Sequence, residues 1–203
     1  RLLDLGVPSY LIQSTLLGTK PVVFNVTNIA KPAAGQPALL SFDEVATLYH
    51  EFGHALHGMF ANQQYPSLSG TNVARDFVEL PSQINEHWAL EPRVLAHYAV
   101  HHKTGAPMPQ ALADKLKQTV TFNQGYSLTE ILGAAVLDMR WHSMPAGSAE
   151  PAFGTADAFE AGVLEKAGLN LPQVPPRYRS SYFLHIWANG YEAGYYAYLW
   201  AEM

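Results

Sequence analysis

The strongest helical pattern in the sequence covers residues 41–62. Apolar residues recur there three or four positions apart, as on one side of a helix, at Val45, Leu48, Tyr49, Phe52, Leu56, Met59 and Phe60. The run follows Ser41-Phe42-Asp43-Glu44, a capping box in which serine and glutamate satisfy backbone amides at a helix N-terminus. We therefore predict a helix that begins after Ser41 and ends near Asn62.

The rest of the sequence predicts further helices and one short strand region. Residues 21–29 begin at a proline, are rich in β-branched side chains and alternate in polarity, which favours a strand. Helical spacing, with proline or glycine at the breaks, predicts helices at about 76–90, 92–103, 109–123, 127–143 and 156–168, and a last one that begins near Gly190. Prolines between residues 169 and 177 favour an extended segment or a loop. The expected fold class is mainly α, with a small β region near residues 21–29.

Composition narrows the classes of partner. The net charge is −5 and no Lys/Arg-rich run is present, which argues against nucleic acid and anionic membranes as partners. No stretch of ~20 apolar residues predicts a membrane span. Cysteine is absent, which excludes disulfides, zinc–cysteine sites and cysteine nucleophiles. A chain without cysteine fits the cytoplasm, although a periplasmic location remains open.

The first candidate site is His50-Glu51-Phe52-Gly53-His54, an H-E-x-x-H motif inside the capped helix. Residues four positions apart lie on one side of a helix, ~6 Å apart along its axis, so both imidazoles can reach one zinc ion. Glu51 lies about 100° around the helix from His50, where its carboxylate can take a proton from water without binding the metal. The alternative is a helix with two surface histidines. The long, well-capped helix that carries the motif counts against this alternative.

Glu79 is the candidate for a third ligand, because a catalytic zinc takes three protein ligands and leaves a position for water. It lies 25 positions after His54, in an otherwise apolar stretch just before Pro81, where an exposed carboxylate is less expected. Its alternative role is charge compensation at a helix N-terminus.

Other polar residues near the motif are expected to support the ligands rather than to join them. His57 lies ~10 Å from His50 along the helix axis, too far for His50, His54 and His57 to share one ion, so we expect it to pack nearby. Metal-bound histidines usually need an acceptor for their second ring nitrogen. Three carboxylates are candidates for this role, and the sequence does not rank them: Asp43, Asp76 and Glu86.

Two segments resemble the thimet oligopeptidase family of zinc metallopeptidases. They are His-Glu-Phe-Gly-His-Ala-Leu-His at residues 50–57 and Gly-Thr-Asn-Val-Ala-Arg-Asp-Phe-Val-Glu-Leu-Pro-Ser-Gln at residues 70–83. From about residue 14 to residue 203 the chain is similar to the catalytic part of that family, and most similar to its dipeptide-releasing bacterial members. The resemblance implies one zinc ion per chain, held by His50, His54 and Glu79, with Glu51 as general base.

The resemblance also implies a zincin-like helical catalytic domain that is only partly present. Members of the family are several hundred residues longer at the N-terminus and somewhat longer at the C-terminus. Residues 1–5 do not look like a natural start, and residues 199–203 stop inside an apolar helical pattern. We therefore expect residues 1–203 to be a fragment of a longer chain. The missing N-terminal part of the same polypeptide is an expected partner, since it would supply much of the opposite wall of the substrate channel.

Residues 182–198 are unusually rich in tyrosine. Three of these tyrosines recur at i, i+4 and i+7, which places their hydroxyls on one side of a predicted helix. An aromatic core stripe is the ordinary interpretation of this spacing, but buried tyrosine hydroxyls need polar partners. In the family that the chain resembles, this segment bends over the zinc, and its histidine and tyrosines hold the substrate and the transition state. Carried over by position, these residues are His185, Tyr191, Tyr195 and Tyr198. Tyr198 or Tyr191 would then donate to the oxyanion, and the sequence does not choose between them.

The remaining basic residues indicate no further chemistry. Arg177 and Arg179 have the charge to pair with the C-terminal carboxylate of a substrate, but solvated loop charges are the simpler interpretation. Five histidines show no ligand spacing and are expected as surface or core residues: His87, His97, His101, His102 and His142.

The expected function is zinc-dependent hydrolysis of short peptides with release of C-terminal dipeptides. Two alternatives remain open: an endo-acting oligopeptidase of the same family, and a zinc-binding but inactive helical fragment.

Overall fold

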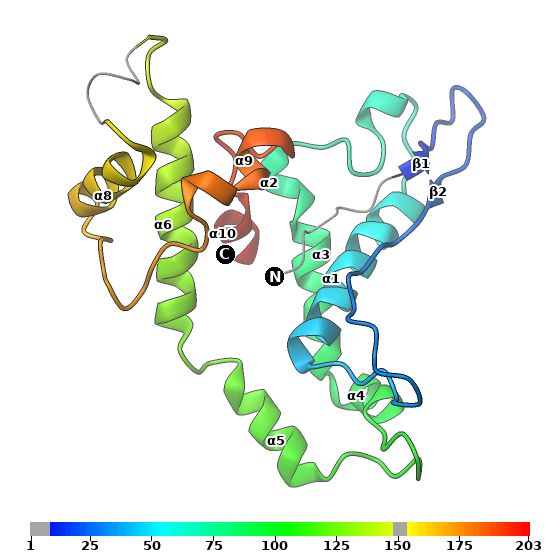
Figure 1. Ribbon diagram of the computed structural model, residues 1–203. Coiled ribbons are helices and arrows are strands. Elements are labelled where there is room, and N and C mark those ends of the chain that lie inside the picture. The colour runs from blue at the N-terminus through cyan, green and yellow to red at the C-terminus, as the bar shows by residue number, and fades with distance from the viewer. Residues whose placement is uncertain (1–8, 148–153) are drawn as a thin grey trace. The chain divides into compact units, whose positions relative to one another are not determined.

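A computed structural model of the chain describes residues 9–147 and 154–203 (Figure 1). These residues divide into two compact units, one that ends at Thr119 and one that begins at Val120. Both units are built mainly from helices, and the described residues form one two-stranded sheet. The predicted fold class is therefore confirmed.

The first unit is organised around two helices that run side by side, α1 at Phe42–Met59 and α3 at Leu80–Glu86 (Figure 1). The other helical elements of this unit are η1 at Pro66–Leu68, α2 at Arg75–Val78, η2 at His87–Leu90, α4 at Pro92–Tyr98 and α5 at Gln110–Thr119.

The N-terminus of α1 is capped as the sequence predicts. Ser41 Oγ accepts a hydrogen bond from Glu44 N at 3.2 Å, and Glu44 Oε2 accepts one from Ser41 N at 2.7 Å. Asp43 and Glu44 also place negative charge at this end, where it is favoured by the helix dipole. The helix ends at Met59, slightly before the predicted end. These contacts fix the start of the helix that carries the H-E-x-x-H motif.

The helix predicted over residues 76–90 is divided into α2, α3 and η2. Pro81 lies in the first turn of α3, where its missing N–H and fixed φ are tolerated. Glu79 lies at the junction, as the last residue before α3, with φ −84° and ψ −12°. The division therefore places Glu79 at the N-terminal end of a short helix rather than in the middle of a long one.

The strand predicted over residues 21–29 is wrong in its length. β2 covers only Val22–Val23 and pairs antiparallel with β1, Ser9–Leu11. Residues 24–29 contain no strand, and the side chains of Phe24, Val26 and Ile29 are exposed. β-Branched composition favours extended backbone, but a strand also needs a partner to accept its hydrogen bonds.

In the second unit the long helix α6, Gln124–His142, contributes to two apolar clusters. In one cluster, Leu137 of α6 packs with three residues of α8, Ala156–Lys166, which are Phe159, Val163 and Leu164. The other involves the C-terminal segment, which contains η3 at Ser180–Tyr182, α9 at Leu184–Ala188 and α10 at Ala197–Glu202. Its buried members are Ala134, Ala135, Phe183, Ile186 and Tyr195. Residues 169–177 contain no helix, as predicted.

The last helix begins at Ala197 rather than near Gly190, so that prediction is wrong. Residues 192–196 form turns, and both Gly190 and Ala193 have positive φ, at 76° and 54°. A right-handed helix cannot continue through such residues. The three tyrosines at positions 191, 195 and 198 therefore do not share one side of a helix.

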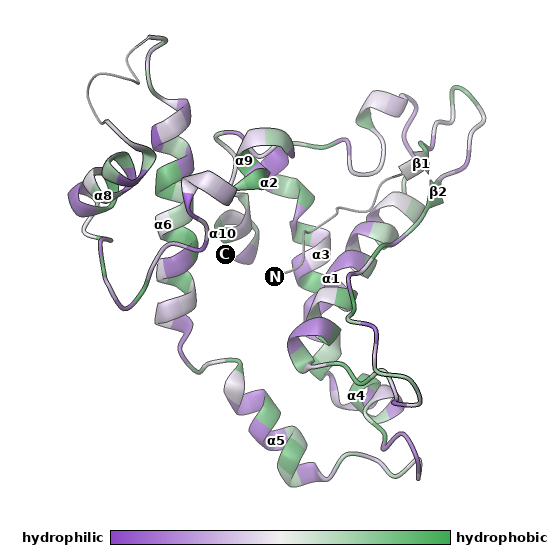
Figure 2. Cartoon of the chain, viewed as in Figure 1, coloured by the Kyte–Doolittle hydropathy of each residue, from purple (hydrophilic) through white to green (hydrophobic). Residues whose placement is uncertain are grey.

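Hydrophilic and hydrophobic residues are interspersed along α1 and α6 (Figure 2). Among the described residues, none of the helices combines the length and apolar character needed to cross a membrane.

Candidate metal centre

The site depends on an unusually close approach of α1 and α3 at Gly53. A Cβ atom at Gly53 would lie 2.6 Å from the carbonyl oxygen of Pro81 and 2.6 Å from Cα of Ser82, distances that no real side chain adopts. Glycine alone leaves room for this contact. One turn away the same two helices are joined by a hydrogen bond of 2.6 Å from Asn85 Nδ2 to Tyr49 O.

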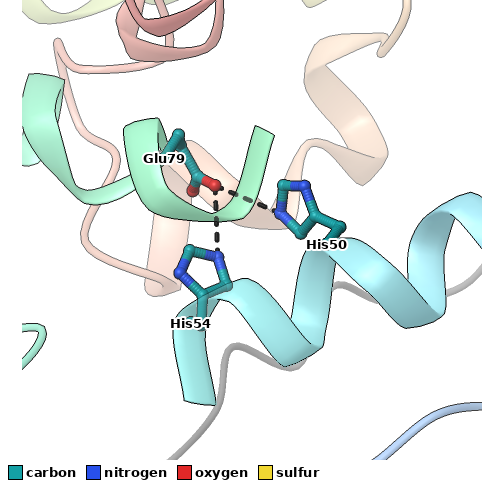
Figure 3. A group of neighbouring side chains, drawn as sticks. All are labelled: His50, His54 and Glu79. Atoms are coloured by element: carbon teal, nitrogen blue, oxygen red, sulfur yellow. Dashed lines mark ion pairs between the residues drawn. The ribbon is translucent and has the colours of Figure 1, made fainter. Parts of the chain in front are cut away.

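This packing brings three predicted side chains together. His50 and His54 project from α1, and Glu79 reaches them from the junction of α2 and α3 (Figure 3). Glu79 Oε2 lies 3.2 Å from Nε2 of His50 and 3.2 Å from Nε2 of His54. One candidate ligand atom from each of the three residues lies within 4.8 Å of the others. Two imidazole nitrogens and one carboxylate are a donor set that suits a catalytic zinc ion, so these residues fit such a metal.

Contacts within the cluster shift the pKa values of His50 and Glu79. Burial would by itself lower the pKa of His50, but hydrogen bonds and charge interactions with Glu79 and Glu86 raise it to about 10. Burial would raise the pKa of Glu79, but its contacts with His50 and His54 lower it well below the ordinary value. The Glu79 carboxylate is therefore held in its charged form, which is the form that binds a metal.

Further residues orient the cluster. Glu86 Oε1 lies 2.7 Å from Nδ1 of His50, so Glu86 is the candidate among the three carboxylates that contacts this ring. Ser82 Oγ donates to Glu79 Oε2 at 2.9 Å and is completely buried. Asp43 is exposed in the first turn of α1, and Asp76 lies in the first turn of α2.

The sequence analysis missed Ser82 and Asn85. Both are buried and lie one and two turns after Glu79, on the side of α3 that meets α1. Their positions on the α3 helix would have been a usable signal, but only once the break at Glu79 was known.

Glu51 and His57 also lie on α1, but neither belongs to the His50–His54–Glu79 cluster. Glu51, the predicted general base, is buried, with 3% of its surface exposed. His57 packs against Phe77, with ring centroids 6.2 Å apart, and among the described residues it is not part of the cluster. Burial and the neighbouring His54 lower the pKa of His57.

The predicted substrate residues gather within the second unit, although not on one helix. The ring of His185, in α9, lies 5.9 Å from Tyr191, 5.5 Å from Tyr195 and 6.4 Å from Tyr198. Tyr191 and Tyr198 stack at 5.4 Å with their planes 16° apart, and Tyr195 lies 5.1 Å from Tyr198. The turn between Gly190 and Ala197, rather than helical periodicity, produces this arrangement.

The two arginines considered for a substrate carboxylate form ion pairs within the second unit. Arg179 Nε lies 2.5 Å from Oε2 of the buried Glu160, so this partly exposed loop charge also forms an ion pair. Arg177 Nη1 lies 3.7 Å from Glu130 Oε2.

Comparison with known proteins identifies the family of this chain. The sequence model of Peptidase family M3 matches residues 7–203. The chain belongs to peptidase family M3. The M3 chain is 56% identical over 195 residues to the dipeptidyl carboxypeptidase of Escherichia coli (strain K12), and also to that of Salmonella typhimurium (strain LT2). It is 37% identical over 185 residues to oligopeptidase A of Escherichia coli (strain K12).

These matches cover most of the M3 chain but a minor part of each relative. They include 96% of this chain and 28% of each dipeptidyl carboxypeptidase, and 91% of this chain and 27% of oligopeptidase A. The chain therefore spans less than a third of the length of the curated relatives that it matches. The predicted resemblance is confirmed at the level of the family.

Proposed function

We propose that this M3 chain carries the metal-binding and catalytic residues of a zinc peptidase that removes C-terminal dipeptides from short peptides. The observation that carries the proposal is the convergence of His50, His54 and Glu79 on the closely packed α1–α3 pair. The 56% identity to two dipeptidyl carboxypeptidases supports dipeptide release. The 37% identity to oligopeptidase A keeps endo-cleavage as the second candidate.

In the proposed mechanism His50, His54 and Glu79 hold a zinc ion, which when bound polarises water and the scissile carbonyl. Glu51 takes a proton from the attacking water and delivers it to the leaving amine. Glu51 is buried on α1, one residue after His50, which supports a role beside the metal ligands rather than at the protein surface.

Hydrogen bonds hold the ligands for this chemistry. Glu86 accepts from Nδ1 of His50, which would leave Nε2 of the same ring free to bind a metal. Ser82 donates to Glu79 Oε2 and so limits rotation of the carboxylate.

The tyrosine segment of the second unit is proposed to contact the substrate. His185 and Tyr195 would hold the peptide backbone, and the hydroxyl of Tyr198 or Tyr191 would donate to the oxyanion. The ring cluster described above supports a shared role for these residues, since all four lie within contact distance of a neighbour.

We further propose that residues 1–203 form part of one catalytic domain of a cytoplasmic enzyme. The rest of the polypeptide would complete the binding site for short peptides. Neither nucleic acid nor a membrane is expected as a partner, in line with the net charge of −5.

The deciding experiment combines zinc content with peptidase activity in the full-length protein. We expect about one zinc per chain, and reversible loss of activity on chelation. His54→Ala should lose both zinc and activity, because it removes one of the three ligands. The matched control is His97→Ala, on an exposed side of α4 in the same unit, which should keep both.

Glu51→Gln separates metal binding from catalysis. The amide cannot take a proton, so the variant should keep about one zinc and lose nearly all hydrolysis. Asp43→Asn makes the same chemical change at an exposed position of α1 and should leave hydrolysis within about twofold of the parent. Hydrolysis at the parent rate by Glu51→Gln would refute the general-base assignment, and a parent without zinc would refute the metal site.

Product mapping separates the two modes of cleavage. Peptides blocked at the N-terminus and digested for increasing times should lose successive C-terminal dipeptides. Internal cleavage as the first event would favour the oligopeptidase instead.

A further inference from the structure

Asp138 is a buried carboxylate that the proposed mechanism does not use. It lies on α6 with none of its surface exposed. Its Oδ1 accepts a hydrogen bond from Ala193 N at 2.9 Å, and its Oδ2 accepts one from Tyr195 N at 2.8 Å. A carboxylate is costly to bury unless its oxygens receive hydrogen bonds. Both oxygens are used here, and both bind amides of the same turn.

The turn that Asp138 holds adopts an unfavourable backbone conformation. Ala193 has φ 54°, in the left-handed region that residues with a Cβ rarely enter. Inside the turn, Gly194 N donates to Tyr191 O at 2.8 Å. A turn of this kind persists when its surroundings determine it, and the two bonds from Asp138 do so from outside the segment.

The position of this turn sets the positions of the tyrosine rings. Tyr191 precedes the turn, and Tyr195 donates its own amide to Asp138. Ala197 N donates to Gly194 O at 3.0 Å, which starts α10, and Tyr198 is the second residue of that helix. The two amides that Asp138 binds lie between Tyr191 and Tyr198 in sequence. The stacking of these two rings therefore depends on where Asp138 holds the intervening backbone.

His142 in turn orients Asp138. Its Nδ1 lies 2.8 Å from Asp138 Oδ1 and 3.0 Å from the backbone oxygen of the same residue, one helical turn away. Its ring also lies 5.6 Å from that of Trp187, in α9. These contacts restrict rotation of the carboxylate, so that its two oxygens stay directed at the two amides.

We propose that Asp138 is a positioning residue for the tyrosine hydroxyls. It touches no substrate and acts through the backbone of residues 193–195. This role rests on the proposed function, in which Tyr198 or Tyr191 donates to the oxyanion. Without the carboxylate, the amides of Ala193 and Tyr195 lose their acceptors and the rings lose their fixed placement.

A double-mutant cycle in the full-length protein tests this role. Asp138→Asn has the same shape but offers one acceptor oxygen instead of two, so kcat should fall about 10-fold to 100-fold while KM changes little. Asp138→Asn is then combined with Tyr198→Phe in one double variant and with Tyr191→Phe in another. If Asp138 acts through one of these tyrosines, kcat of that double variant should be little lower than kcat of its more impaired single variant. Activity is expressed per zinc-loaded chain, so that a smaller folded fraction does not count as a lower kcat.

Several outcomes distinguish this role from a general structural one. If the parent is active and the reductions in kcat multiply in both double variants, the positioning role is overturned and the proposed function stays intact. A parent that binds zinc but hydrolyses no peptide would overturn both. The control Asp157→Asn changes an exposed carboxylate on α8 and should alter kcat by less than about twofold.

Hydrogen exchange gives an independent readout that needs no activity. In the parent, the amides of Ala193 and Tyr195 should exchange at least about 100-fold more slowly than unstructured amides, and this protection should fall about tenfold or more in Asp138→Asn. Exchange at unstructured rates in the parent would overturn the anchoring, and this holds even if the variant does not fold. Fragmentation mass spectrometry after exchange resolves the two amides.

Discussion

Gly53 of α1 and Ser82 of α3 lie so close together that a Cβ on Gly53 would be 2.6 Å from Cα of Ser82. The two helices meet here by backbone contact, without a side chain between them. Both contact residues lie next to candidate ligands, because His54 directly follows Gly53 and Ser82 donates a hydrogen bond to Glu79. Because Gly53 has no side chain, α1 and α3 can approach closely enough for the histidines and the Glu79 carboxylate to meet.

Gly53→Ala should separate the two helices and weaken the site. Backbone atoms are the neighbours, so the clash cannot be relieved by rotating a side chain. We expect the free energy of unfolding to fall by about 2 kcal/mol and zinc affinity to fall with it. Urea denaturation followed by circular dichroism, and competition with a zinc chelator, measure the two effects.

The matched control for that substitution is Gly162→Ala on α8. A Cβ there meets no atom within 4 Å, and the added methyl group reduces the backbone freedom of the unfolded chain. This variant should be slightly more stable, by about 0.5 kcal/mol. Equal stability of Gly53→Ala and the parent would contradict the close packing.

Ser82→Ala should weaken zinc binding without a large change in fold. It removes the hydrogen bond of 2.9 Å to Glu79 Oε2, and loss of such a supporting contact typically costs about tenfold in metal affinity. Ser67→Ala, at an exposed position of η1, is the control and should leave affinity unchanged. An unaltered zinc dissociation constant in Ser82→Ala would show that the packing alone orients Glu79.

Substitutions of Glu86 should have graded effects on His50. Glu86→Ala removes the acceptor that lies 2.7 Å from Nδ1 of His50, whereas Glu86→Gln keeps an uncharged acceptor. We therefore expect zinc affinity to fall about tenfold or more in the alanine variant and by less in the glutamine variant. Chelator competition on both proteins checks the order, and a reversed order would argue against a hydrogen-bonding role.

Tyr198→Phe should reduce kcat more than it raises KM. If the hydroxyl donates to the oxyanion, its interaction exists mainly in the transition state, and its removal should lower kcat about 100-fold. Tyr182→Phe is the control, because Tyr182 belongs to the same unit and is exposed. Steady-state kinetics on one blocked peptide compare the variants, and an unchanged kcat in Tyr198→Phe would leave Tyr191 as the remaining candidate.

The sequence by itself determined the helix that carries the histidines and the candidate ligand set. The capping box and the helical spacing are local features. The hydrogen bonds that cap the helix form between residues three positions apart, so they do not depend on distant parts of the chain. The spacing of His50 and His54 follows from helical geometry alone. Glu79 was also predictable, because a carboxylate in an apolar stretch calls for a partner.

Only the tertiary structure decided how these parts meet. The contact at Gly53 brings the histidines of α1 next to a segment about 25 residues further along the chain. In that segment the helix break falls at Glu79, and Ser82 donates to the Glu79 carboxylate. The tyrosine segment differs most from its predicted form, since its spacing suits a helix but the carboxylate of Asp138 stabilises a turn with a left-handed residue instead. Periodicity describes what a segment can form alone. A buried partner 55 or more residues away can select a different backbone, because its hydrogen bonds outweigh local preference.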